Sequence, residues 1–238
     1  MARVKLRVGQ RPNIIVAPHG GGPTDIRSAE MAEIIAQATN SFAVINTGWI
    51  RPWKGHKEGS PKTVINTKED IKKGFANLND LRQAGQKPAQ QEFLQPIEDY
   101  KNFILQFFKI ANIFLIHGMD DTIRDYNGVD VVVGYGAGDP PRYSCPFTFK
   151  DRFIGSLAME GFKPAQGKSG GRLSAWDKHN LNQLYSNHAR INSVQVEIGL
   201  TIRDTDSTAA KTAIRVASAI NNATGNIYIP FMKKIPER

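Results

Sequence analysis

Two histidines stand where short apolar runs of the sequence end. His19 follows the apolar run 14–17, and His117 closes the run 111–117. Each of them is followed directly by glycine, which lets backbone and solutes approach closely. Two imidazoles and a carboxylate, with a fourth position left for water, form a ligand set that is typical of catalytic zinc. The sequence therefore predicts a site for one zinc ion that includes His19 and His117.

The carboxylate of this ligand set has two candidates. Asp25 belongs to the glycine-rich segment after His19, and this segment can fold back beside the histidine. Glu30 is the second candidate, but it falls inside a predicted helix, where a solvated role near the helix N-terminus is the default. We therefore expect Asp25 to be the third metal ligand.

A further carboxylate, Glu197, lies between apolar residues of a predicted buried strand. A buried carboxylate needs either a partner or a function. As a functional group, Glu197 would take a proton from metal-bound water and pass it to a leaving amine. As a structural group, it would form a buried ion pair with Arg203 or Arg190.

The remaining nucleophile and imidazole candidates have simpler interpretations. Cys145 has no histidine near it in sequence, so a buried inert thiol is favoured over a catalytic cysteine. His179 and His188 flank a possible short helix, which favours surface or capping roles. The glycines after His19 are not followed by Gly-Lys-Ser/Thr, which argues against a phosphate-binding P-loop.

The elements that must position these residues alternate between strands and helices along the whole chain. Period-2 and buried apolar runs predict strands over 4–8, 13–17, 41–46, 111–117, 130–135 and 193–198. Helical spacing predicts helices over 28–39, 68–84, 91–110, 147–161 and 208–222, with a possible short helix over 180–187. This alternation favours an α/β fold, a single domain over residues 1–238 with a mixed, largely parallel sheet and helices on both faces. The carboxyl ends of parallel strands, where His19, His117 and Glu197 lie, are the edge at which such sheets bind ligands.

The composition of the chain indicates which kinds of partner and which cellular compartment to expect. The chain of 238 residues has a formal net charge of +9, yet its basic residues are spread along the sequence rather than gathered in one tract. This distribution favours small anions over nucleic acid as partners. No window approaches the roughly 18 apolar residues of a membrane span, and the N-terminus lacks the apolar region of a signal peptide. A single cysteine fits a reducing compartment, so we expect a cytoplasmic protein.

Together the motifs resemble a known family. Ala-Pro-His19-Gly-Gly, Asp25-x-x-Ser28, Ile-His117-Gly-Met-Asp and Val-Gln-Val-Glu197-Ile are similar, in this order, to the motifs of the N-formylglutamate amidohydrolase family. They are also similar to those of the related poly-γ-glutamate hydrolases. The resemblance implies a zinc-carboxypeptidase-like α/β fold and a zinc-dependent amidohydrolase. Carried over, His19, Asp25 and His117 would bind the metal and Glu197 would be the acid/base.

The resemblance also implies residues that hold the substrate. The family has an arginine followed by an Asp-x-Asn-Arg element for the substrate carboxylate, and Arg51 and Asn66 match parts of it. Ile65 stands in place of the acid and Thr67 in place of the second arginine, so one bidentate guanidinium contact is missing or relocated. Independently of the resemblance, the glycine-rich segment 167–171 is a candidate flap over the pocket, and it makes Lys168 and Arg172 available for anionic substrates.

The sequence thus predicts a hydrolase of an amide bond near a carboxylate, in an N-acyl amino acid, an N-formylglutamate-like compound, or a γ-glutamyl or peptide substrate. The competing hypothesis is a non-catalytic, anion-binding descendant of the same fold.

Overall fold

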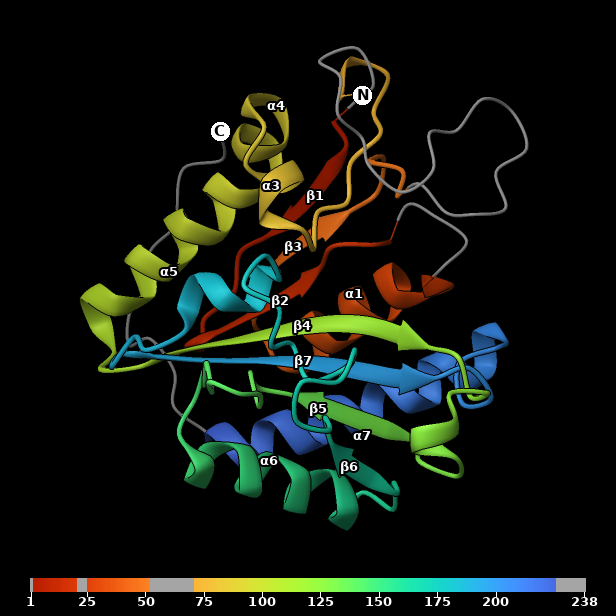
Figure 1. Cartoon of the computed structure of the whole chain (residues 1–238). Helices are drawn as coiled ribbons and strands as arrows, with labels where there is room; N and C mark the ends of the chain where they lie inside the picture. Colours follow the sequence, from red (N-terminus) through yellow and green to blue (C-terminus); the bar gives the residue numbers. More distant parts are fainter. Residues whose placement is uncertain (1, 21–24, 52–70, 226–238) are drawn as a thin grey trace.

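The computed structural model describes residues 2–20, 25–51 and 71–225, and Figure 1 shows their arrangement. Its centre is a seven-stranded sheet with the order β1-β3-β2-β4-β7-β5-β6. The strands are β1 (Val4–Arg7), β2 (Asn13–Ala17), β3 (Phe42–Asn46), β4 (Ala111–Met119), β5 (Val131–Gly134), β6 (Pro164–Gln166) and β7 (Ile191–Gly199).

The middle of the sheet is parallel and its margins are mixed. Strands β3, β2, β4 and β7 run parallel to one another, whereas β1 pairs with β3, and β5 with β7, in antiparallel fashion. At the far edge, β6 pairs with β5 in parallel. Figure 1 shows the long strands β4 and β7 side by side with their arrowheads at the same end. The carboxyl ends of β2, β4 and β7 therefore share one edge of the sheet.

Helices cover both faces. They are α1 (Ser28–Ala38), α3 (Leu81–Ala84), α4 (Lys87–Ala89), α5 (Gln95–Phe107), α6 (Phe147–Met159) and α7 (Asp206–Thr224), with a π-helical turn η2 (Gln90–Leu94) and 3-10 turns η3 (Arg124–Tyr126) and η4 (Leu181–Tyr185). Among these helices, none combines the length and apolar character that crossing a bilayer requires.

Alternation along the strands creates two cores. In β2, Ile15 and Ala17 pack in the core that includes α1, α6 and α7, while Ile14 and Val16 pack on the other face with residues of α5. A strand buried on both faces reads as a continuous apolar run, and for this reason 14–17 has no polar alternation. The same geometry places Glu197 on the face opposite its neighbours Val196 and Ile198.

This architecture confirms the predicted α/β class, and it matches most predicted elements to within a few residues. The predicted helix over 68–84 is wrong, because residues 73–80 form turns and take part in two isolated bridges. Only 71–72 and α3 are helical among the described part of that range. Gly74 has φ +91°, which helical geometry forbids, and the Asp80 side chain accepts the Arg82 N–H to begin a new helix. The three-residue strand β6 was not predicted, since it is too short for a periodic signal.

Candidate metal centre

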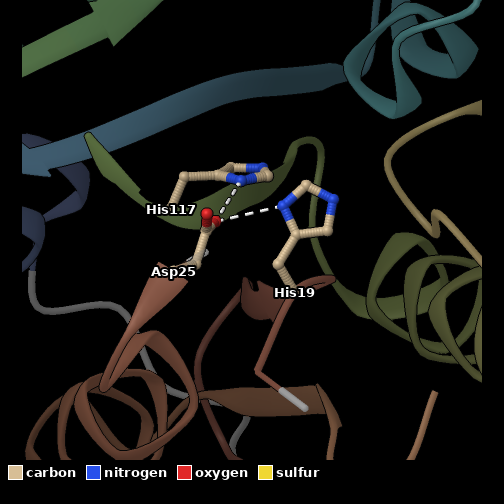
Figure 2. A group of neighbouring side chains, drawn as sticks. All are labelled: His19, Asp25 and His117. Atoms are coloured by element: carbon tan, nitrogen blue, oxygen red, sulfur yellow. Dashed lines mark hydrogen bonds and ion pairs between the residues drawn. The ribbon is translucent and has the colours of Figure 1, made fainter. Parts of the chain in front are cut away.

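Three buried side chains meet at the shared carboxyl edge of the sheet (Figure 2). Nδ1 of His19 and Nδ1 of His117 each lie 3.0 Å from the same oxygen, Oδ2 of Asp25. One potential ligand atom from each residue lies within 4.8 Å of the other two. The two rings meet edge to face, with centroids 4.9 Å apart. The structure therefore brings together the three residues that the sequence predicts as metal ligands.

The turn after β2 holds His19 in place. The Asn46 side chain, at the end of β3, donates to the Pro18 carbonyl (2.9 Å), which ties the exits of the two strands together. Directly after His19, a Cβ on Gly20 would stand 2.4 Å from Cβ of Ala29 and 2.5 Å from the Asn46 carbonyl oxygen. Only glycine allows this close approach of the turn to α1, so packing explains why glycine follows the histidine.

A buried arginine ties the Asp25 segment to the ends of β4 and β7. Arg203 donates to the backbone carbonyls of Ile26 (2.6 Å), Ile198 (3.0 Å) and Met119 (3.1 Å). Its guanidinium fills the space beside Gly118, where a Cβ would lie 2.4 Å from the guanidinium carbon. The ion pair considered between Arg203 and Glu197 is therefore not formed, because the guanidinium is used to hold three backbone segments.

Glu197 lies next to His117 because the two are register partners of the parallel pair β4–β7. Its Oε1 accepts a hydrogen bond from Nε2 of Gln195 (2.7 Å), two residues earlier on the same face of the strand. Gln195 is itself held, since its Oε1 accepts from Nδ2 of Asn180 (2.9 Å) and Nδ2 of Asn79 (3.4 Å). Among the described residues Glu197 makes no ion pair, and Arg190, the other proposed partner, donates to main-chain carbonyls instead.

The two carboxylates of the site have opposite electrostatic settings. Burial raises the pKa of Glu197 to about 7, an effect that Asp25 increases and that His117, Arg172 and Arg51 reduce. Burial alone would also raise the pKa of Asp25, but the attraction and hydrogen bonds of the two histidines outweigh it and hold that pKa well below its ordinary value. Asp25 is thus a permanent anion suited to a ligand, while Glu197 can exchange a proton near neutral pH.

The basic residues predicted at this edge differ in how close they lie to the trio. Nη1 of Arg51 lies 3.4 Å from Nδ1 of His19 and 3.9 Å from Oδ1 of Asp25, and the side chain is 28% exposed. Arg172 is exposed but close enough to Glu197 to lower its pKa. Lys168 is paired with Asp125 (2.8 Å). Asn66 lies outside the described residues.

The other candidates take no part in the trio. Glu30 is exposed on α1, which leaves Asp25 as the carboxylate of the trio. Cys145 is buried, and burial raises the pKa of its thiol to about 12, in keeping with the inert thiol expected. The backbone N–H of His179 donates to Asp177, and Nδ1 of His188 accepts from the Arg190 N–H, as expected for turn residues.

Two residues that contact the site escaped the sequence reasoning. Gln195 could have been found, because strict alternation places it on the same face of the strand as Glu197. Asn77 accepts a hydrogen bond from Nε2 of His19 (2.8 Å), and no spacing rule indicates it, since it lies in the segment predicted as helix.

Comparison with known structures supports the fold. An N-formylglutamate amidohydrolase from Ralstonia eutropha matches with a TM-score of 0.56 and 13% sequence identity, over 92% of this chain and 97% of that one. A gene product of Agrobacterium tumefaciens matches with a TM-score of 0.55 and 12% identity, over 92% and 94%. A bacteriophage poly-gamma-glutamate hydrolase matches with a TM-score of 0.47 and 15% identity, over 92% and 89%. No protein-family model matches the sequence, and no curated protein matches it.

At such identities the first two matches establish a shared fold, which is the fold that the motif resemblance implies. Chemistry has to be argued from the site itself.

Proposed function

We propose that this chain is a zinc-dependent amidohydrolase that cleaves an amide bond near a carboxylate. The observation that carries the proposal is the buried trio of His19, Asp25 and His117, whose potential ligand atoms all lie within 4.8 Å of one another. A buried carboxylate flanked by two imidazole nitrogens is a donor set that suits zinc better than Mg²⁺ or Ca²⁺, which prefer oxygen.

The geometry of the trio supports a metal. In a tetrahedral zinc site with bonds of about 2.0–2.1 Å, neighbouring donor atoms lie about 3.3 Å apart. The observed contacts of 3.0 Å from Oδ2 of Asp25 to each Nδ1 are close to this value. When bound, zinc supplies polarisation of the amide carbonyl and a lowered pKa of a water ligand.

Glu197 supplies the proton transfers. With a pKa near 7 it can accept a proton from the attacking water and then donate it to the amine nitrogen that leaves. Gln195 occupies Oε1 of Glu197, so Oε2 is the oxygen available for both transfers. Deep burial keeps bulk water from competing for that oxygen.

Arg51 and Arg172 would bind the anionic part of the substrate. Arg51 lies against the donor trio and is still partly exposed, so its guanidinium can donate to a substrate carboxylate at the mouth of the site. Arg172 adds positive charge at the exposed rim, and Asn66 remains a proposed third contact.

The test is metal content followed by hydrolysis. Protein purified without added zinc should contain about one zinc per chain. It should hydrolyse N-formyl-L-glutamate or another N-acyl amino acid better than the same compound with its carboxylates blocked as amides. Treatment with a chelator should abolish the activity, and zinc should restore it.

The competing hypothesis, a non-catalytic anion-binding protein, makes a different prediction in the same assay. Such a protein would bind N-acyl amino acids, detected by calorimetry, without hydrolysing any member of the series. Absence of both zinc and hydrolysis would refute the proposed function.

A further inference from the structure

His19 has a second hydrogen-bond partner outside the metal trio. Its Nε2 lies 2.8 Å from Oδ1 of Asn77, a residue of the turn segment 73–80 rather than of the sheet. This contact is on the far side of the imidazole from Asp25, so the ring is held at both nitrogens. The corresponding atom of His117, Nε2, is buried and has no hydrogen-bond partner among the residues that the structure describes. The two histidines are therefore not equivalent.

The contacts of Asn77 determine which of its side-chain atoms faces the ring. The same atom that contacts His19 also accepts the backbone N–H of Asn79 (3.1 Å). A backbone N–H can only donate, so this atom must be the amide oxygen and not the amide nitrogen. An amide oxygen can only accept, so Nε2 of His19 carries the hydrogen.

A neutral imidazole that is protonated on Nε2 has its lone pair on Nδ1. Nδ1 of His19 is the nitrogen that faces Asp25 Oδ2 at 3.0 Å. When no metal is bound, Nδ1–H can donate to this oxygen, and a bound zinc ion would take the place of that hydrogen. The hydrogen bond to Asn77 thus keeps one hydrogen on Nε2, so that Nδ1 is the nitrogen whose lone pair would face a metal.

The backbone around Asn77 is itself anchored. Its N–H donates to Oε1 of Gln83 (2.8 Å), and its carbonyl accepts the N–H of Asp80 (3.0 Å). The segment is joined to the exit of β3 by two further bonds, from the Ile50 N–H to the Gly74 carbonyl (2.8 Å) and from the Ala76 N–H to the Ile50 carbonyl (3.1 Å). The amide oxygen is therefore presented to His19 by a fixed support.

From these contacts we infer that Asn77 is a positioning residue for His19, one that fixes its tautomer and assigns Nδ1 as the metal-binding nitrogen. The inference rests on the proposed function in so far as that function requires a metal on the trio. It adds a residue from outside the sheet edge to the machinery of the site.

The experiment measures zinc affinity directly, by competition with a chromophoric chelator, and so needs no substrate. Asn77→Leu keeps the side-chain size but removes the acceptor, and it should weaken zinc binding by about 10- to 100-fold. Asn77→Asp keeps an acceptor oxygen at the same place and should bind zinc at least as tightly as the native protein. Lys73→Ala removes an exposed side chain from the same turn segment and leaves the contacts of His19, Asn77 and Glu197 described above in place, so it serves as the matched control and should change affinity by less than about threefold.

A second measurement covers the case in which Asn77→Leu fails to fold. Nitrogen-15 NMR of the native, zinc-loaded protein should show His19 with a hydrogen on Nε2 and the metal on Nδ1. A metal on Nε2 of His19 would overturn the inference.

The outcomes separate the inference from the proposed function. If the native protein binds zinc and Asn77→Leu binds it equally well, the inference fails and the proposed function stands. Equal losses in Asn77→Leu and Asn77→Asp would show that the segment only needs Asn77 for its own structure, which also overturns the inference. A native protein that binds no zinc would refute the proposed function and the inference with it.

Discussion

Replacing Glu197 by glutamine should change how the stability of the zinc-free protein depends on pH. Burial raises the pKa of Glu197 from its ordinary value of 4.5 to about 7 in the folded protein. The folded state therefore holds the proton more tightly than the unfolded state. Between these two values the folded chain binds more protons than the unfolded chain, so the free energy of unfolding falls as pH rises.

The size of this effect follows from the same two values. A rise in pKa from 4.5 to about 7 corresponds to about 3 kcal/mol in the free energy of unfolding. The native protein loses this stability progressively between pH 4.5 and about pH 7, and above that range the free energy no longer depends on Glu197. Glu197→Gln cannot ionise, and its side-chain oxygen can still accept the hydrogen bond from Gln195. We therefore compare the free energy of unfolding of the variant with that of the native protein at two pH values. Between about pH 4 and about pH 8 this difference should change by up to about 3 kcal/mol in favour of the variant.

The assay is urea unfolding of chelator-treated protein at a series of pH values. Glu30→Gln makes the same chemical change at an exposed position of α1, so its curve should follow that of the native protein. Parallel curves for the native protein and Glu197→Gln would refute the idea that burial raises the pKa of the Glu197 carboxyl. With zinc and substrate present, Glu197→Gln should retain the metal and lose about a hundredfold or more in kcat, whereas undiminished turnover would mean that Glu197 is only structural.

Three further predictions concern the remaining residues of the site and the thiol. Asp25→Asn should lower zinc affinity by at least about tenfold, because it removes the only anionic donor of the trio; a variant that keeps native affinity in chelator competition would place the metal elsewhere. Arg51→Ala should abolish the preference for substrates with a free carboxylate while leaving the reaction of blocked substrates little changed, as measured by kcat/KM for a matched pair of amides. Cys145 should resist alkylation by iodoacetamide at neutral pH in the folded protein and react in urea, because burial raises its pKa to about 12; rapid modification of the native thiol would contradict its burial.

The amino-acid sequence alone was sufficient to predict the fold class, most helices and strands, and the three residues His19, Asp25 and His117 that the structure brings together; that they bind a metal stays a prediction. Strands 14–17 and 111–117 could be recognised because burial on both faces leaves a local, continuous apolar signal. Since the carboxyl ends of parallel strands share an edge, the positions of His19 and His117 at strand ends were enough to expect them at one site. The choice of Asp25 followed from its short distance in sequence to His19.

The tertiary structure decided which contacts the remaining polar side chains make. Arg203 was a possible partner of Glu197, but its guanidinium donates to three backbone carbonyls, because the fold brings these acceptors, from three separate segments, to the buried guanidinium. Asn77 reaches His19 only because Gly74 and Asp80 break the predicted helix over 68–84 and a bridge to Ile50 brings the turn to the site. The periodicity of apolar residues indicates which face of a single helix or strand is buried, and this is a local property of the sequence. Asp25 and His117 are 92 positions apart in sequence, and the distance between such atoms depends on the packing of the whole sheet.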